Sequence, residues 1–87
     1  MYAYGEILKD KSFAIPLKNG IYLITFSYPY NSSFGLYVVT AFANAVNIGV
    51  ITPANSIEIV HYTVNNGVNI SNNSENSIWY RVVNLFK

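Results

Sequence analysis

The sequence contains no cysteine and very little charge. Among 87 residues, five are Lys or Arg and four are Asp or Glu, which gives a formal net charge of +1. The absence of cysteine excludes a disulfide framework and a thiolate metal site. The near-neutral charge excludes a basic surface for nucleic acid, so nucleic acid is not expected as a partner. Stability must therefore come from packing, within the chain or between copies of it.

Catalytic signatures are also absent. The acidic residues are Glu6, Asp10, Glu58 and Glu75. They are scattered and form neither a carboxylate pair suited to glycoside hydrolysis nor a calcium-binding loop. The single histidine, His61, follows Glu58 by three residues, which places the two on opposite faces of a regular strand. Hydrolase, nucleotide-binding and zinc motifs are missing. We therefore expect no enzymatic activity, no catalytic residue, no cofactor and no metal ion.

One long uncharged segment raises the question of a membrane span. Residues 19–57 carry no charge, and residues 34–54 alone are long enough to cross a bilayer. Polar residues and a proline interrupt this segment, among them Asn44, Asn47 and Pro53, and no Lys or Arg cluster flanks it. Two short strands joined near Asn44 explain the same residues better. No membrane span is predicted.

What the sequence does contain is strand-forming residue types. Val, Ile, Thr, Tyr, Phe and Trp make up 37 of the 87 residues, and such side chains fit a pleated, half-buried surface. Turn-forming residues separate short apolar runs, and no segment shows helical periodicity. We predict one all-β domain, residues 1–87, folded as an antiparallel β-sandwich or jelly roll of about eight short strands. The predicted strands cover residues 4–8, 12–17, 21–28, 35–43, 46–51, 56–64, 68–71 and 78–86.

Two Asn-Gly dipeptides mark predicted turns. Asn19-Gly20 separates the runs 12–17 and 21–28, and Asn66-Gly67 precedes the run 68–71. Asn-Gly flanked by apolar runs is the strongest short-range signal for a hairpin. We therefore predict a hairpin at Asn19-Gly20 and a turn at Asn66-Gly67.

Several predicted strands are apolar on both faces. In the run 21–28, for example, Ile21 and Leu23 alternate with Tyr22 and Ile24. A monomeric sandwich should instead show one apolar and one polar face on each strand. A chain of this size cannot cover both faces, so we predict a homo-oligomer, with a trimer favoured. The alternative is that tyrosine tolerates exposure and that the second faces are merely amphipathic.

The segment from Tyr28 to Phe34 is predicted to be a loop that combines aromatic rings with small polar groups. Such rings stack on sugar faces, while amide and hydroxyl groups form hydrogen bonds with sugar hydroxyls. This composition predicts a shallow binding site. The alternative is that the rings close one end of the sandwich or form a subunit contact. The predicted ligand-binding residues are Tyr28, Tyr30, Asn31, Ser32, Ser33 and Phe34, and residues 72–77 are a second candidate without an aromatic anchor.

The order of segments along the chain carries a further signal. The C-terminal third consists of a turn, the strand Val68-Asn69-Ile70-Ser71, a polar loop and the strand Trp79-Tyr80-Arg81-Val82-Val83. This arrangement resembles the ends of phage tail-fibre and baseplate proteins. The opening Gly5-Glu6-Ile7-Leu8 and the run 13–24 are similar to the first strands of the same family. Its domains are small β-sandwiches, usually trimeric, at the distal end of tail appendages.

The resemblance implies a non-enzymatic binding module of a phage tail appendage. Such a module would recognise a host cell-surface glycan or another tail protein, and it would be located in the virion, where it contacts the bacterial surface. The alternative is a structural virion protein without a ligand, such as a capsid decoration or a tail assembly component. Members of the family are mostly long chains with stems, so we expect either an excised domain or a small separate virion protein.

Overall fold

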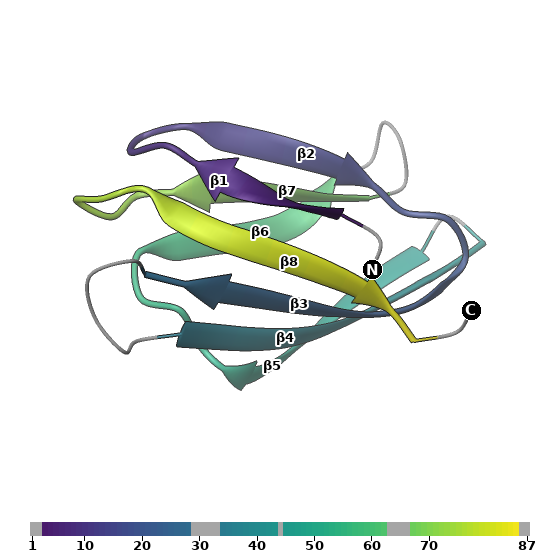
Figure 1. Ribbon diagram of the computed structural model, residues 1–87. Coiled ribbons are helices and arrows are strands. Elements are labelled where there is room, and N and C mark those ends of the chain that lie inside the picture. Colours follow the sequence, from purple (N-terminus) through teal and green to yellow (C-terminus); the bar gives the residue numbers. More distant parts are fainter. Residues whose placement is uncertain (1–2, 29–33, 44, 63–66, 86–87) are drawn as a thin grey trace.

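Eight antiparallel strands in two facing sheets make up the protein, as the computed structural model shows (Figure 1). The structure describes residues 3–28, 34–43, 45–62 and 67–85, apart from the side chains of Phe34, His61 and Tyr62. The predicted all-β sandwich is confirmed, and each strand lies within two residues of its predicted bounds. The strands are β1 (Ala3–Ile7), β2 (Ser12–Pro16), β3 (Gly20–Ser27), β4 (Phe34–Phe42), β5 (Ala45–Thr52), β6 (Ile57–Tyr62), β7 (Gly67–Asn72) and β8 (Ile78–Asn84).

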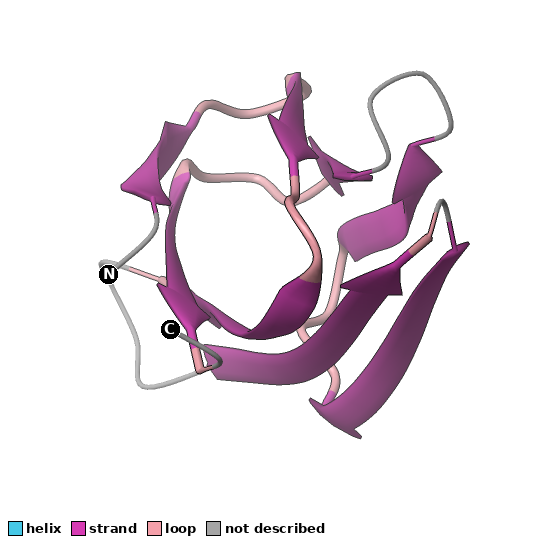
Figure 2. Ribbon diagram, turned by 90° about the vertical axis from the view of Figure 1, so that its right-hand side faces the viewer, coloured by secondary structure: helices cyan, strands magenta, loops and turns pink. Residues whose placement is uncertain are grey.

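The two sheets contain five and three strands. Their strand orders are β1-β8-β3-β4-β5 and β2-β7-β6. The pairing is nested, because β1 pairs with β8 and β2 pairs with β7. Seen from the side in Figure 2, the two sheets curve around one shared interior. The described residues contain no helix long and apolar enough to cross a membrane.

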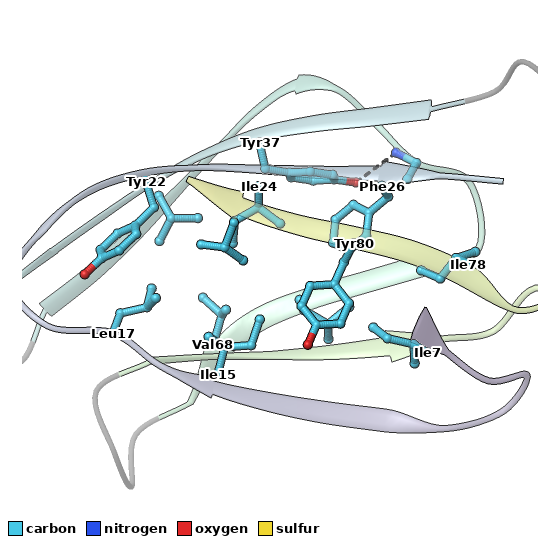
Figure 3. Packing of buried hydrophobic residues seen from close by; sticks show 14 of the residues in the cluster. Ile7, Ile15, Leu17, Tyr22, Ile24, Phe26, Tyr37, Val68, Ile78 and Tyr80 are labelled. Atoms are coloured by element: carbon cyan, nitrogen blue, oxygen red, sulfur yellow. Dashed lines mark hydrogen bonds between the residues drawn. The ribbon is translucent and has the colours of Figure 1, made fainter. Parts of the chain in front are cut away.

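The core lies between the sheets and follows the period-two alternation of the strands. On β3, the side chains of Tyr22, Ile24 and Phe26 have no exposed surface, whereas Ile21 and Leu23 are half-buried on the other side. Large aromatic and branched side chains from both sheets fill the interior (Figure 3). The buried apolar residues are Ile7, Ile15, Leu17, Tyr22, Ile24, Phe26, Tyr37, Val39, Ala41, Ala54, Val68, Ile70, Ile78, Tyr80 and Val82.

Two of the buried tyrosines bind the backbone through their hydroxyl groups. The Tyr37 hydroxyl accepts a hydrogen bond from the backbone N–H of Ala54 at 2.9 Å, and the Tyr22 hydroxyl donates to the carbonyl oxygen of Lys18 at 2.8 Å. The Tyr37 ring also meets Phe26 edge-on, with ring centroids 5.5 Å apart. These tyrosines therefore serve as apolar core residues whose polar ends are satisfied.

The hairpin predicted at Asn19-Gly20 is wrong. β2 and β3, which flank this dipeptide, belong to different sheets: β2 pairs with β7, and β3 pairs with β4 and β8. A type I′ hairpin turn requires a positive φ at its central residues. None of the described glycines, Gly20 included, has a positive φ. The connection after Leu17 instead carries the chain from one sheet to the other.

The other predicted turns lie where the strand pairing requires them. β6 and β7 pair antiparallel, so the chain reverses between Tyr62 and Gly67, although residues 63–66 lie outside the described residues. β4 and β5 form a hairpin that reverses between Phe42 and Ala45. Ala43 in this hairpin has a φ of 51°, a left-handed conformation that is uncommon for a residue other than glycine.

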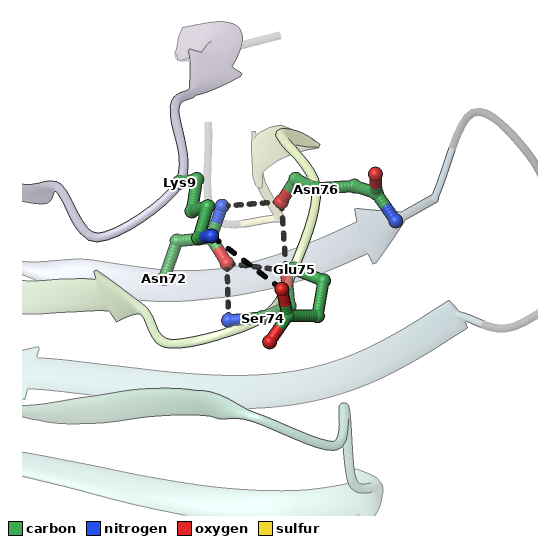
Figure 4. A network of polar contacts seen from close by, with 5 residues as sticks. All are labelled: Lys9, Asn72, Ser74, Glu75 and Asn76. Carbon is green, nitrogen blue, oxygen red and sulfur yellow. Dashed lines mark hydrogen bonds and ion pairs between the residues drawn. The ribbon is translucent and has the colours of Figure 1, made fainter.

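A buried asparagine joins the two sheets at one end of the sandwich (Figure 4). Asn72 is fully buried, and its Nδ2 donates to the carbonyl oxygens of Ile7 at 2.8 Å and Asn76 at 2.9 Å. Its Oδ1 accepts from the backbone N–H and the hydroxyl of Ser74, at 2.9 and 2.6 Å. Both amide hydrogens and the amide oxygen are thus satisfied, which is the condition for burying such a group without a large cost.

Candidate functional site

The outer faces of the two sheets differ in character. On the three-stranded sheet, the residues that alternate with the core positions are mostly small or polar, such as Ser12, Asn69 and Glu58. The Ser12 and Ser71 hydroxyl groups, on neighbouring strands, lie 3.0 Å apart in a hydrogen bond. This face has the polar character expected of a sheet surface in contact with water.

The outer face of the five-stranded sheet is apolar near its centre. Leu23 on β3 lies opposite Val38 on β4 and Val83 on β8, and all three are half-buried. The described chain supplies two layers only, so none of its elements covers this face. The second apolar face that the sequence predicts for these strands is therefore confirmed in the structure.

A groove with a volume of about 380 Å³ lies on this outer face, where β1, β8 and β3 run side by side. It is lined by Tyr4, Thr25, Ser27, Trp79, Tyr80 and Arg81. Arg81 lies on β8, the middle strand of the three, opposite Tyr4 on β1 and Thr25 on β3. Trp79 is the next outward residue along β8 and lies opposite Ser27.

Strand geometry explains why these side chains gather on one face. Successive residues of a strand point to opposite faces, so Trp79 and Arg81 point outward while Tyr80, between them, points into the core. Tyr80 is 8% exposed and packs against the Phe13 ring, with centroids 5.3 Å apart. Gly5, directly opposite Tyr80 on β1, leaves room for that ring, since a β-carbon there would lie 3.1 Å from the Tyr80 hydroxyl. The groove therefore has a rigid, aromatic support beneath it.

The two outward-pointing aromatic residues of the groove are well exposed. Trp79 is 45% exposed and Tyr4 is 69% exposed. Exposed tryptophan and tyrosine beside hydroxyl groups provide flat apolar surfaces together with hydrogen-bonding partners. The groove offers the hydroxyls of Thr25 and Ser27 and the guanidinium of Arg81. The lining therefore combines flat apolar surfaces with hydrogen-bonding groups of both kinds, donors and acceptors.

The predicted binding loop is only partly described. Tyr30, Asn31, Ser32 and Ser33 lie outside the described residues, and of Phe34 only the backbone, at the start of β4, is described. In the sequence, the loop follows Ser27, which is the last residue of β3 and one of the residues that line the groove. The sequence-based assignment of these residues stays a prediction.

Tyr28, the first residue of that predicted site, has a structural contact. It is half-buried against the core, and its hydroxyl donates to the carbonyl oxygen of Asn55 at 2.5 Å. Burial, and to a smaller extent the neighbouring Tyr37, raises the pKa of the Tyr28 hydroxyl above its ordinary value of about 10. Tyr28 thus ties the end of β3 to the connection between β5 and β6.

The second candidate loop, residues 72–77, is largely occupied by its own hydrogen bonds. The Asn72 amide is fully used within the protein. The Ser74 hydroxyl also lies 2.7 Å from the carbonyl oxygen of Asn76, so its single hydrogen is shared between this oxygen and Asn72 Oδ1. Glu75 pairs with Lys9 at 3.4 Å in an exposed ion pair. Within the described residues, no group of three or more His, Cys, Asp or Glu is placed to hold a metal ion.

The groove residues cannot be recognised as a site from the sequence alone. Three strands that are distant in the sequence contribute them, and which strands become neighbours could not be predicted. One signal was available, because Trp79-Tyr80-Arg81 alternates an aromatic and a cationic residue on one face of a strand. A single Arg within a run of strand-forming apolar residues indicates an outward, water-facing position.

Comparisons with protein-family models, with curated proteins and with solved structures find no match. The similarity to phage tail-fibre and baseplate proteins therefore stays a prediction that rests on the sequence pattern.

Proposed function

We propose that this protein is a non-enzymatic recognition module that binds a glycan in the groove between β1, β8 and β3. The observation that carries the proposal is the exposure of two aromatic residues next to Arg81, Tyr4 opposite it on β1 and Trp79 two residues before it on β8. The hydroxyls of Thr25 and Ser27 lie opposite Arg81 and Trp79 on β3. The weakly positive C–H bonds of a pyranose pack favourably on the negative face of an aromatic ring. The hydroxyls then set the orientation of the sugar.

The resemblance to phage tail proteins supports a biological setting for this activity. In that setting the module belongs to a tail appendage of the virion and binds a glycan of the bacterial surface. The predicted loop residues follow Ser27, which lines the groove, in the sequence and stay candidates for a further ligand contact. A single shallow site gives modest affinity, because each hydrogen bond to an exposed sugar replaces one to water and nets only about 1 kcal/mol.

Oligomerisation would turn this modest affinity into stable attachment. We propose a homo-oligomer, with the trimer favoured by the family resemblance. Two features support self-association: the apolar centre of the outer face around Leu23 and Val38, and the edge strand β5, which carries no charged residue. Several sites on one particle raise the apparent affinity by about 10² to 10⁴ without any new contact.

The same apolar face favours a second candidate function. A structural virion protein would use this face and the β5 edge for subunit contacts and would need no ligand. In that case Trp79 and Tyr4 would be buried in a protein interface, and the groove would bind no glycan.

A glycan array probed with the purified protein and with Trp79→Ala separates the two functions. Trp79 is exposed, so its replacement should leave the fold intact while removing the stacking surface. Phe42→Ala is a matched control, because Phe42 is 43% exposed and lies at the other end of the same sheet. The proposal expects binding that Trp79→Ala abolishes and Phe42→Ala retains. Absence of binding to any glycan, with Trp79→Ala changing the oligomer mass, would favour the structural protein.

A further inference from the structure

Arg81 is the one cationic residue on the five strands of the larger sheet. The single other charged residue on these strands is Glu6. Arg81 is exposed, so its charged end lies at the surface of the sheet. Its position at the centre of the groove, between Tyr4 and Thr25, places a permanent positive charge where a ligand would bind.

The Arg81 guanidinium has no partner in the part of the chain that the structure describes. The ion pair found there joins Lys9 to Glu75, and no hydrogen bond or ring contact involves Arg81. Glu6 is its diagonal neighbour on the same face, because Glu6 lies opposite Trp79 while Arg81 lies opposite Tyr4. Even so, the two charges do not form an ion pair. The five N–H donors of the guanidinium are therefore available to a ligand.

We propose that the groove selects an acidic sugar, with the sugar carboxylate bound by Arg81. This inference rests on the proposed glycan-binding function and specifies its ligand class. A planar guanidinium binds a carboxylate through two parallel hydrogen bonds, which fixes orientation as well as charge. The neighbouring rings of Trp79 and Tyr4 would receive the sugar, and Thr25 and Ser27 would bind its hydroxyls.

The charges around the groove favour a carboxylate over a phosphate. One guanidinium matches the single negative charge of a carboxylate. A phosphate monoester carries up to about two negative charges, so the one guanidinium would leave about one of them uncompensated beside the exposed Glu6. No lysine lies on the strands of this sheet to supply a second positive charge.

Trp79 makes the test direct, because it is the single tryptophan of the chain and lines the groove. The methyl glycosides of glucuronic, galacturonic and sialic acid are each added to the protein, and the selectively excited Trp79 fluorescence is measured at each concentration. Each acid is compared with its own methyl ester, which has the same ring but no charge. Glucose 6-phosphate serves as the phosphate probe. A fluorescence change therefore reports on the surroundings of the groove.

The proposal expects at least one acid to bind about three- to tenfold more tightly than its ester, with the difference shrinking as salt is added. Arg81→Gln should remove that preference, so that the acid and its ester bind with similar affinity. Glu6→Gln should strengthen binding of the acid about twofold by removing the repelling charge. Lys18→Gln, which removes one positive charge before β3 and away from the groove, should have no effect.

Three outcomes would overturn the inference, and each differs from failure of the proposed function. Equal affinity for acid and ester, unaffected by Arg81→Gln, would show a neutral sugar site and leave glycan binding intact. Tighter binding of glucose 6-phosphate than of every acid would show that the anion class is wrong. Array binding that does not change Trp79 fluorescence would place the glycan site elsewhere. If no glycan binds by fluorescence or on the array, the proposed function fails together with the inference.

Discussion

The side-chain amide of Asn72 on β7 donates a hydrogen bond to the carbonyl oxygen of Ile7 at the end of β1, and so joins the two sheets. Asn72→Ala would leave that carbonyl and the Asn76 carbonyl without this donor. Each buried polar group that loses its partner costs about 1–3 kcal/mol. We expect Asn72→Ala to lower the free energy of unfolding by about 2–4 kcal/mol, measured by urea denaturation.

A neighbouring asparagine provides the control for this prediction. The Asn73 side chain is exposed, and the contact seen at this residue is the backbone hydrogen bond from its N–H to the carbonyl oxygen of Ser56. Asn73→Ala should change the free energy of unfolding by less than about 0.5 kcal/mol. Equal effects of the two substitutions would contradict the role given to Asn72.

Gly67 on β7 is predicted to tolerate no side chain. A β-carbon at this position would lie 1.9 Å from the carbonyl oxygen of Ile15, a backbone atom that cannot move without disturbing β2. Gly67→Ala should therefore destabilise the protein by more than about 3 kcal/mol or prevent folding. Gly49→Ala is the matched control, because its β-carbon would make only an ordinary contact at 3.6 Å with the Val38 carbonyl oxygen. Thermal unfolding of Gly67→Ala at the wild-type temperature would refute this account.

Alkaline pH should destabilise the protein. Burial raises the pKa of Tyr80 above its ordinary value of about 10, and burial followed by the effect of Tyr37 raises the pKa of Tyr28. The folded state therefore holds these phenolic protons more tightly than the unfolded state does. The resulting stability is fully present below pH 10 and is lost as the pH rises through the raised pKa values.

The urea midpoint measured as a function of pH tests this prediction. We expect it to fall above about pH 10, and we expect a shallower fall for Tyr80→Phe, which keeps the ring and removes the titrating hydroxyl. An identical pH dependence in the wild type and in Tyr80→Phe would mean that Tyr80 titrates as it does in the unfolded chain.

Self-association through the edge of the five-stranded sheet gives a fourth prediction. β5 pairs only with β4 within the described chain, spans eight residues and exposes Val50 and Ile51 at 56% and 59%. A long, uncharged edge strand pairs readily with another strand, and a lysine on it opposes such pairing. Val50→Lys should shift the sedimentation mass toward the 9.7 kDa monomer.

A second valine on an edge strand controls for the loss of apolar surface. Val60, on β6 of the smaller sheet, is 43% exposed. Val60→Lys should leave the oligomer mass unchanged. A wild-type protein that sediments as a monomer at micromolar concentrations, or a Val60→Lys variant that dissociates as readily as Val50→Lys, would argue against the β5 interface.

Local patterns predicted the strands because strand formation depends on residue type and alternation. The run from Gly20 to Ser27 illustrates this, since its apolar positions alternate between a fully buried and a half-buried face. The partner of each strand could not be predicted in the same way. Asn19-Gly20 has the local chemistry of a hairpin, but β2 pairs with β7 instead of β3. In that pair Ile15 lies opposite Val68, and both side chains belong to the core.

The candidate groove could not be predicted either, because it depends on which strands pair. Tyr4 and Arg81 are distant in the sequence and become neighbours only because β1 pairs with β8. Composition could point to the aromatic loop after Tyr28, since all its residues are contiguous. It could not point to a site built from three strands, and the one local clue was the outward alternation of Trp79 and Arg81.

The central claim, that the groove between β1, β8 and β3 is the recognition surface, is tested most directly by mapping the bound glycan by NMR. The glycan chosen is the one that the array identifies, and the amide and indole N–H shifts of the labelled protein are followed during its titration. The account predicts that the largest shifts occur at Trp79, Arg81, Thr25 and Tyr4, with little change at Leu23 and Val38. Large shifts confined to the apolar centre of the sheet or to the three-stranded sheet, with Trp79 unmoved, would contradict it.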